Sequence, residues 1–182
     1  MNLCDPAVFC RAFDFAAQAH QGQKVPGGDI PYISHVAQVA METMQALLYT
    51  PELDANLAVQ CALLHDTVED TAVTPAQIAE QFGDRVASGV LSLSKNPNLP
   101  KPDQMADSLR RILQHSPEVQ LVKMADRINN LRQPPHYWTT EKKISYRDEA
   151  LVILQTLRGA SDYIGQRLAQ QITAYSVYFA EQ

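Results

Sequence analysis

The sequence of 182 residues has few cysteines, no long apolar run and no excess of basic residues, and each shortage excludes a class of protein. Its three cysteines, Cys4, Cys10 and Cys61, are odd in number and follow no recognisable spacing, which argues against a disulfide framework and against a cysteine-based zinc site. No apolar run approaches the roughly 20 residues of a membrane-spanning helix, and the chain does not open with the pattern of a signal peptide. We therefore expect a cytoplasmic protein without a membrane partner.

The charge balance disfavours a further class of protein. A formal net charge of -5 is unlike that of nucleic-acid-binding proteins, which usually carry a basic face, so we expect no nucleic-acid partner. A small anionic substrate stays open, because local lysines and arginines together with a metal ion can reverse the sign of the charge inside one cleft. With 46% hydrophobic and 19% charged residues, the chain is predicted to form a single globular domain over residues 1–182.

The alternation with period two that marks a strand is also missing, and no internal repeat is visible. Apolar residues instead recur at helical spacing in segments that are separated by loops containing proline and glycine. The pattern predicts an all-α protein with helices over residues 6–20, 32–48, 54–70, 75–82, 86–93, 105–114, 117–131, 141–157 and 161–179. We expect the last helix to pack outside the bundle or at a subunit contact, which leaves a homo-oligomer open.

One stretch, ALLHDTVEDT at residues 62–71, brings four ionisable side chains into six residues at the end of an apolar segment. Two other helical segments each carry one polar residue in an apolar pattern, His35 in the first and Asp126 in the second. An uncompensated polar group is costly to bury, so these residues need a common explanation. Two imidazoles and two carboxylates suit Mn²⁺, Fe²⁺ or Zn²⁺ and leave positions for water and substrate. We predict a metal site on His35, His65, Asp66 and Asp126.

Four segments in this order, AHQGQ, PYISHV, ALLHDTVEDT and LVKMADRINNLR, resemble the guanosine tetra- and pentaphosphate hydrolase domain of the RelA/SpoT family, within the HD-domain metal-dependent phosphohydrolases. The chain is most similar to the stand-alone small alarmone hydrolases, and the resemblance covers most of its length. It implies an HD-type helical bundle and the removal of the 3′-pyrophosphate from guanosine 3′,5′-bis(diphosphate) and related (p)ppGpp, usually with Mn²⁺. The synthetase half of the large family members has no room in this chain, so we expect hydrolysis alone.

Two acidic residues follow the His-Asp pair. Glu69 and Asp70 lie one helical turn beyond His65 and Asp66, a spacing that stacks side chains on one helix face. They could therefore reach a water molecule on the metal without being ligands. A carboxylate beside that water can orient it and accept its proton, and a neighbouring acid can help the leaving oxygen depart. We assign Glu69 and Asp70 jointly to water activation and proton transfer.

Five residues are candidates for substrate binding: Lys24, Lys101, Asn130, Lys142 and Tyr146. Asn130 follows Asp126 by four residues, so it shares a helix face with Asp126 and can present an amide to the substrate. The resemblance implies the other four. Lys24 is what remains of a basic pattern in the loop at residues 21–31, and Lys101 lies near a position where a basic residue approaches the phosphates. Lys142 and Tyr146 match positions that line the nucleotide pocket, Tyr146 against the ribose or base.

Three further residues have competing interpretations. His20 ends the first helix either near the site or as a surface histidine, and we give the two interpretations equal weight. Arg127 and Arg132 fit structural salt bridges better than phosphate contacts.

Two other functions stay open. The loop at residues 21–31 departs from the family pattern after Lys24, which would also suit an adenosine alarmone, (p)ppApp, another 3′-phosphorylated nucleotide or a nucleotide monophosphate. A regulatory module that binds an alarmone without hydrolysing it is the non-enzymatic alternative. Such a module would be expected to lose a metal ligand or the acidic pair, and this chain retains all six residues, which favours hydrolysis. A purely structural helical bundle would leave the buried charges unexplained.

Overall fold

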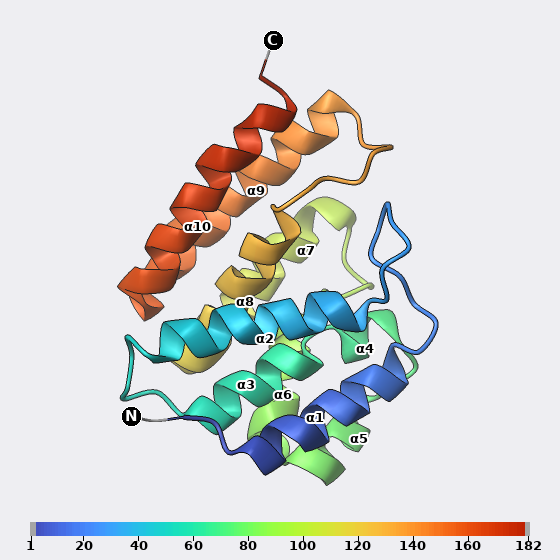
Figure 1. Cartoon of the computed structure of the whole chain (residues 1–182), viewed down its shortest axis with the longest axis vertical. Helices are drawn as coiled ribbons and strands as arrows, with labels where there is room; N and C mark the ends of the chain where they lie inside the picture. Colours follow the sequence, from blue (N-terminus) through green and yellow to red (C-terminus); the bar gives the residue numbers. More distant parts are fainter. Residues whose placement is uncertain (1–2, 181–182) are drawn as a thin grey trace.

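Helices joined by short loops make up the computed structural model, which describes residues 3–180 and contains no strand in that range (Figure 1). The all-α prediction is thus confirmed. The helices are α1 (Pro6–Ala19), α2 (Ile33–Leu47), α3 (Ala55–Leu64), α4 (Thr67–Asp70), α5 (Pro75–Phe82), α6 (Asp84–Leu93), α7 (Lys101–Ile112), α8 (Pro117–Asn130), α9 (Thr140–Leu157) and α10 (Asp162–Tyr175). Single 3-10 turns follow α9 at Arg158–Ala160 and α10 at Ser176–Tyr178.

Side-chain caps fix several helix starts where the sequence predicts them. The Asp5 carboxylate accepts a hydrogen bond from the Ala7 N–H, and Pro6 occupies the first turn, where a backbone N–H is not needed. Thr74 and Gln77 form a reciprocal capping box at the start of α5. These local contacts explain why the predicted and observed starts agree there.

Three predicted helices differ from the structure. The one expected over residues 161–179 ends at Tyr175 and is followed by the 3-10 turn Ser176–Tyr178. The helix expected over residues 54–70 breaks after Leu64, because the His65 Nδ1 lies 2.8 Å from the Ala62 carbonyl and the Thr67 hydroxyl bonds the Leu64 carbonyl. These side chains take backbone acceptors that a continuing helix would use. The helix expected from residue 105 begins at Lys101, since Pro102 falls in its first turn, where proline is tolerated.

The arrangement places α3 and α8 at the centre. Helix α2 packs on both, α1 and α6 pack on α3, and α9 and α10 lie side by side along α8 (Figure 1). Most residues of α3 and α8 are buried, including Leu63, Leu64, Leu121 and Met124. Burying one such side chain contributes about 2 kcal/mol to folding. Polar residues on the buried faces of these two helices, such as Asp126, are therefore carried into the interior.

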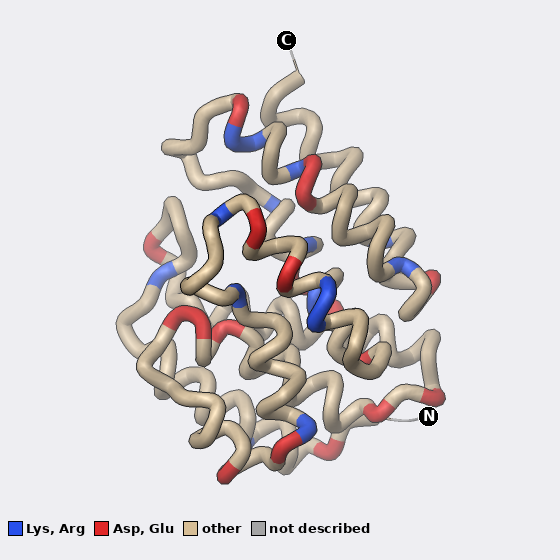
Figure 2. The backbone as a smooth tube through the Cα atoms, turned by 180° about the vertical axis from the view of Figure 1, so that it is seen from behind, with Lys and Arg blue, Asp and Glu red and all other residues tan. Residues whose placement is uncertain are grey.

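The outer helices cover this core. Helix α10 packs on α8 and α9 at the outside of the bundle through Ile164, Leu168, Ile172 and Tyr175. Lys and Arg are interspersed with Asp and Glu along the backbone when the molecule is seen from behind (Figure 2). None of the helices in residues 3–180 has the length and apolar character needed to span a membrane. The prediction of one domain over residues 1–182 stays a prediction, and its first and last two residues lie outside the described range.

Candidate metal centre and adjoining pocket

Three side chains from three helical segments meet in the interior. His35 comes from α2, His65 follows α3 and Asp126 comes from α8, and their ligand atoms lie within 4.8 Å of one another. The His35 Nε2 lies 3.4 Å from the His65 Nε2 and 3.5 Å from the Asp126 Oδ1. All three residues are at most 7% exposed. Buried polar atoms that converge in this way are suited to holding a cation.

Asp66 joins this cluster at the break between α3 and α4. Its Oδ2 lies 2.9 Å from the His65 Nε2 and 3.5 Å from the His35 Nε2. The Tyr32 hydroxyl donates a hydrogen bond of 2.6 Å to the same oxygen. The helix break therefore lets adjacent residues, His65 and Asp66, direct their side chains at one point. The four predicted metal ligands lie together.

The cluster strongly perturbs its own titration. Burial would raise the pKa of Asp66, but the His65 and His35 imidazoles reverse this effect and hold that pKa well below its usual range. Burial likewise disfavours the charged form of His65, and the Asp66 and Asp126 carboxylates outweigh it, so the His65 pKa is raised well above its ordinary value. Without a metal, a proton on the imidazole compensates the buried carboxylates, and a cation can take that role.

Further groups hold Asp126 in place. Lys123 lies one helical turn earlier, with its Nζ 3.3 Å from the Asp126 Oδ2. Asn130 lies on the same face of α8, as its spacing predicts, and its Nδ2 donates to the Asp126 Oδ1. Burial would raise the pKa of Asp126, but Lys123 and His65 hold this pKa below its usual value. The carboxylate is thus oriented and kept ionised.

The two acidic residues of α4 have different surroundings. The Glu69 carboxylate accepts hydrogen bonds from the Lys95 backbone N–H at 2.8 Å and from the Lys95 Nζ at 3.2 Å. For Asp70, partial burial and the charges of Asp66 and Glu69 raise the pKa to about 6. Glu69 is therefore held as an ion pair, whereas Asp70 can hold or release a proton near neutral pH.

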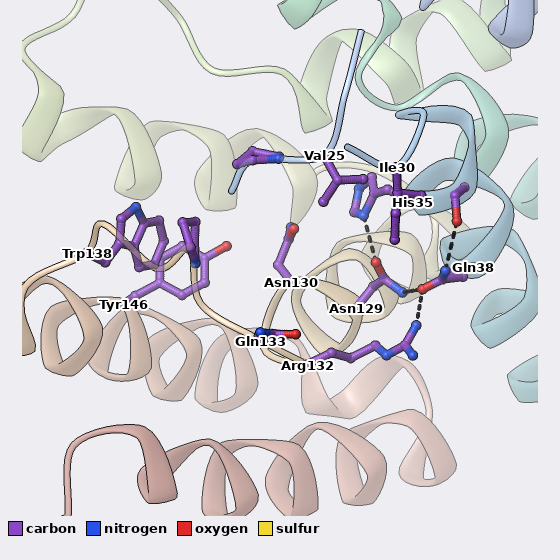
Figure 3. A pocket seen from close by; sticks show the side chains of 13 residues that line it. Val25, Ile30, His35, Gln38, Asn129, Asn130, Arg132, Gln133, Trp138 and Tyr146 are labelled. Carbon is purple, nitrogen blue, oxygen red and sulfur yellow. Dashed lines mark hydrogen bonds between the residues drawn. The ribbon is translucent and has the colours of Figure 1, made fainter. Parts of the chain in front are cut away.

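A cavity of about 410 Å³ adjoins the metal centre and has His35 in its wall. Apolar side chains from two loops form one part of the lining, and amide and guanidinium groups form another (Figure 3). Trp138 and Tyr146 meet edge to face with ring centroids 4.9 Å apart, and the Arg127 guanidinium lies 4.0 Å from the Tyr146 ring centroid. The lining residues are Val25, Pro26, Ile30, Ser34, His35, Gln38, Asn129, Asn130, Arg132, Gln133, Pro135, Trp138 and Tyr146.

A second cavity, of about 670 Å³, is lined by Glu69 and Lys95 together with residues of α6 and α7. Burial lowers the pKa of Lys95, but the Glu69 carboxylate and then the charge of Asp126 outweigh this effect, so the pKa is raised. Lys95 therefore lines this cavity as a charged ammonium paired with Glu69.

The substrate-binding candidates divide into two groups. Asn130 and Tyr146 line the cavity beside His35. Lys24, Lys101 and Lys142 line neither of the two cavities described above. Lys24 is exposed and paired with Asp29, and Lys142 lies 5.4 Å from the Trp138 ring centroid. Lys101 is exposed at the start of α7.

Four further residues contact the site or its neighbours and are not predicted as site residues from the sequence: Tyr32, Gln38, Lys95 and Asn129. The contacts of Lys95 and Asn129 join distant parts of the chain, and no local pattern marks them. His20 is 3% exposed, and its ring centroid lies 4.9 Å from that of Tyr32, so it lies near the site rather than at the surface. Arg127 pairs with Glu149 at 3.0 Å, which confirms the structural salt bridge.

Comparisons with known proteins agree with this geometry. The sequence profile of the HD domain matches residues 12–163. Guanosine-3′,5′-bis(diphosphate) 3′-pyrophosphohydrolase MESH1 of Danio rerio is 34% identical over 176 residues, covering 93% of this chain and 95% of the relative. The Homo sapiens protein of the same name is 32% identical and covers 90% of this chain and 92% of its own length. A solved structure described as a metazoan orthologue of SpoT that hydrolyses ppGpp superposes with a TM-score of 0.81 at 26% identity, over 93% of this chain and 96% of that one.

Proposed function

The chain belongs to the HD-domain family. We propose that it is a guanosine-3′,5′-bis(diphosphate) 3′-pyrophosphohydrolase. It hydrolyses (p)ppGpp to GDP or GTP and pyrophosphate. The two relatives of this name described above align with this chain over 95% and 92% of their own length. The observation that carries the proposal is the convergence of His35, His65, Asp66 and Asp126 beside a cavity that can hold a nucleoside.

The four side chains fit a divalent ion. The Ala62 carbonyl can only accept a hydrogen bond, so the His65 Nδ1 carries a hydrogen and the Nε2 is the nitrogen that faces the cluster. A metal ion would replace the proton that this Nε2 holds in the metal-free protein. Two neutral imidazoles and two carboxylates balance two positive charges. This mixture of nitrogen and oxygen ligands suits Mn²⁺, Fe²⁺ or Zn²⁺, and we propose Mn²⁺. When bound, such an ion would neutralise charge on phosphoryl oxygens and lower the pKa of a water molecule.

The chain's own residues would then move the proton. Water attacks the phosphorus that is bonded to the 3′ oxygen, and the bond between that phosphorus and the 3′ oxygen breaks. We assign Asp70 to accept the proton from water and to return one to the 3′ oxygen, because a pKa of about 6 suits both steps. Glu69 would act alongside it by holding the Lys95 ammonium beside the diphosphate. This division refines the joint role that the sequence predicts for Glu69 and Asp70.

The nucleoside would occupy the cavity of about 410 Å³. Tyr146 would contact the ribose or base, and Asn130 would donate to the substrate while it holds Asp126. Lys95, which pairs with Glu69 and lines the second cavity, would be the basic residue that meets the diphosphate. Lys24, Lys101 and Lys142 could contribute to phosphate binding only after their side chains move from their present positions.

The second candidate substrate differs from the first in its purine base. Val25 and Pro26 line the nucleoside cavity at the place where the family resemblance implies adjacent basic residues. Apolar groups at this place would contact either purine ring through its faces, so an adenosine alarmone is the second candidate. The metal chemistry would be the same for both.

The test is pyrophosphate release from ppGpp and from its adenosine counterpart, measured side by side with metal-stripped protein. We expect release only after Mn²⁺ is added, and the faster substrate identifies the purine. Failure with both substrates in the presence of bound Mn²⁺ would overturn the proposal. Tight nucleotide binding in that experiment without turnover would instead favour the regulatory module.

A further inference from the structure

A chain of hydrogen bonds connects the nucleoside cavity to the metal centre (Figure 3). The Arg132 Nη1 donates to the Gln38 Oε1, and the Asn129 Nδ2 donates to the same oxygen at 2.8 Å. The Asn129 Oδ1 then lies 2.7 Å from the His35 Nδ1. Sequence reasoning assigns Arg132 to a salt bridge, but its contact is with this amide.

The guanidinium sets the direction of every bond in this chain. Arginine has N–H donors and no acceptor, so the atom of Gln38 that faces Arg132 must be its carbonyl oxygen. The Gln38 amide nitrogen therefore points the other way, to the Ser34 hydroxyl at 3.1 Å. Because the Gln38 oxygen can only accept, Asn129 must offer it the amide nitrogen. The oxygen of Asn129 is left to face His35.

This orientation decides which nitrogen of His35 carries the hydrogen. An amide oxygen only accepts, so the His35 Nδ1 must be the N–H donor, and in the neutral ring the Nε2 is then the nitrogen that holds the lone pair. That Nε2 faces the cluster, 3.5 Å from both the Asp66 Oδ2 and the Asp126 Oδ1. For His65, a backbone carbonyl, which cannot rotate, fixes a hydrogen on the Nδ1 and turns the Nε2 toward the cluster. His35 depends on two amides that can rotate.

We propose that Asn129, Gln38 and Arg132 are positioning residues that fix the tautomer and the ring orientation of His35. The inference rests on the proposed metal site. Without Arg132, the two amide groups can rotate together, because the Ser34 hydroxyl can donate as well as accept. The Asn129 nitrogen would then face the His35 Nδ1 and move the hydrogen to the Nε2, where it would block a metal ion. The Arg132 guanidinium excludes this rotated arrangement of the two amides, because it needs an acceptor at Gln38.

The first measurement is the tautomer of His35 in the metal-free protein, read from nitrogen chemical shifts after labelling with ¹⁵N-histidine. We expect the hydrogen on Nδ1 in the wild type and in Asn129→Asp, whose carboxylate can only accept. Asn129→Leu and Arg132→Met should shift the population toward the form with hydrogen on Nε2. A merely structural role for these residues would not move this signal.

The second measurement is Mn²⁺ affinity by calorimetry on metal-stripped protein. Residues that orient a metal-bound histidine typically contribute about 10- to 100-fold in affinity, so Asn129→Leu should weaken binding by this factor. Asn129→Asp should not weaken binding, because its carboxylate still accepts from the His35 Nδ1 and its charge favours a cation. Gln133→Leu is the matched control, because Gln133 lines the same cavity without joining the chain of hydrogen bonds, and its affinity should not change.

The outcomes separate this inference from the proposed function. Wild-type Mn²⁺ affinity in a folded Asn129→Leu variant would overturn the inference and leave the metal site intact. A neutral His35 with its hydrogen on Nε2 in the wild type would overturn the inference as well. If the wild type binds no Mn²⁺, the proposed metal function fails. The tautomer measurement still decides the positioning role in that case, because it needs no metal. If Asn129→Leu does not fold, Asn129→Asp and Arg132→Met carry the test.

Discussion

Replacing Asp70 with asparagine should stabilise the metal-free protein while it removes activity. Partial burial and the neighbouring charges of Asp66 and Glu69 raise the pKa of Asp70 from an unperturbed 3.8 to about 6. The difference, 6 minus 3.8, is about 2, which at about 1.4 kcal/mol per pKa unit corresponds to about 3 kcal/mol for a group shielded from water. Asp70 lies at the surface, and solvent screening reduces this to about 1 kcal/mol.

The sign of this effect gives it a specific pH dependence. The folded carboxyl group holds its proton more tightly than the unfolded one. The free energy of unfolding should therefore fall as pH rises from about 4 to about 6 and then stay level. The uncharged amide of asparagine does not titrate, so Asp70→Asn should not show this loss in the free energy of unfolding. Asp70→Asn should exceed the wild type in stability at about pH 8 by about 1 kcal/mol, and the gain should vanish at about pH 4.

Urea unfolding of the metal-free wild type and variant at both pH values measures this directly. Glu69→Gln is the matched control, because Glu69 accepts two hydrogen bonds from Lys95 and its replacement should not stabilise the protein. With Mn²⁺ present, loss of the proton-transfer group should lower the turnover of Asp70→Asn by about 100- to 10,000-fold. A stability gain of equal size at both pH values, or no gain at the higher one, would refute the electrostatic reasoning.

Three other substitutions probe the ligands, the phosphate contact and the packing. His65→Ala should abolish Mn²⁺ binding and pyrophosphate release together, and release that survives without bound metal would contradict the site. Lys95→Met should raise the KM for the alarmone more than Lys101→Met does, because Lys95 pairs with Glu69, whereas Lys101 lines neither cavity; steady-state kinetics compare the two. Gly89→Ala places a Cβ 2.9 Å from the Cys61 Sγ, and the resulting overpacking should lower the free energy of unfolding in urea by about 1–3 kcal/mol.

The convergence of His35, His65, Asp66 and Asp126 could be predicted because a polar residue inside an apolar helical pattern stands out in a sequence. His35 and Asp126 each interrupt an apolar helical pattern. Both are buried, in α2 and α8, and a buried polar group costs free energy unless it has a partner. The helix ends with strong local caps, such as Thr74 with Gln77, were predictable for the same reason: the partners are close in sequence.

Residues whose role depends on a distant contact could not be predicted in this way. Lys95 and Lys101 lie in one segment with three prolines and look alike in sequence. Only the fold brings Lys95 to Glu69, 26 positions earlier, and leaves Lys101 exposed. Asn129 meets His35 across 94 positions. The break after Leu64 has a different origin, since His65 and Thr67 each bond a carbonyl three residues earlier. A His or Thr in a helical pattern does not by itself show that its side chain will take a backbone acceptor.

The structure separates the groups that would perform the chemistry from those that would select the nucleoside. Two of the four predicted metal ligands lie on the helices α2 and α8, whereas the loops at residues 21–31 and 133–139 supply much of the apolar lining of the cavity. These loops meet at Gly27, where φ is +82° and an added Cβ would lie 2.9 Å from the Pro135 Cα. None of the four predicted ligands lies in either loop, so substitutions at Val25 or Pro26 would change the cavity wall without removing a ligand. Under the proposed function, such substitutions would alter the choice of purine while the metal chemistry stays constant.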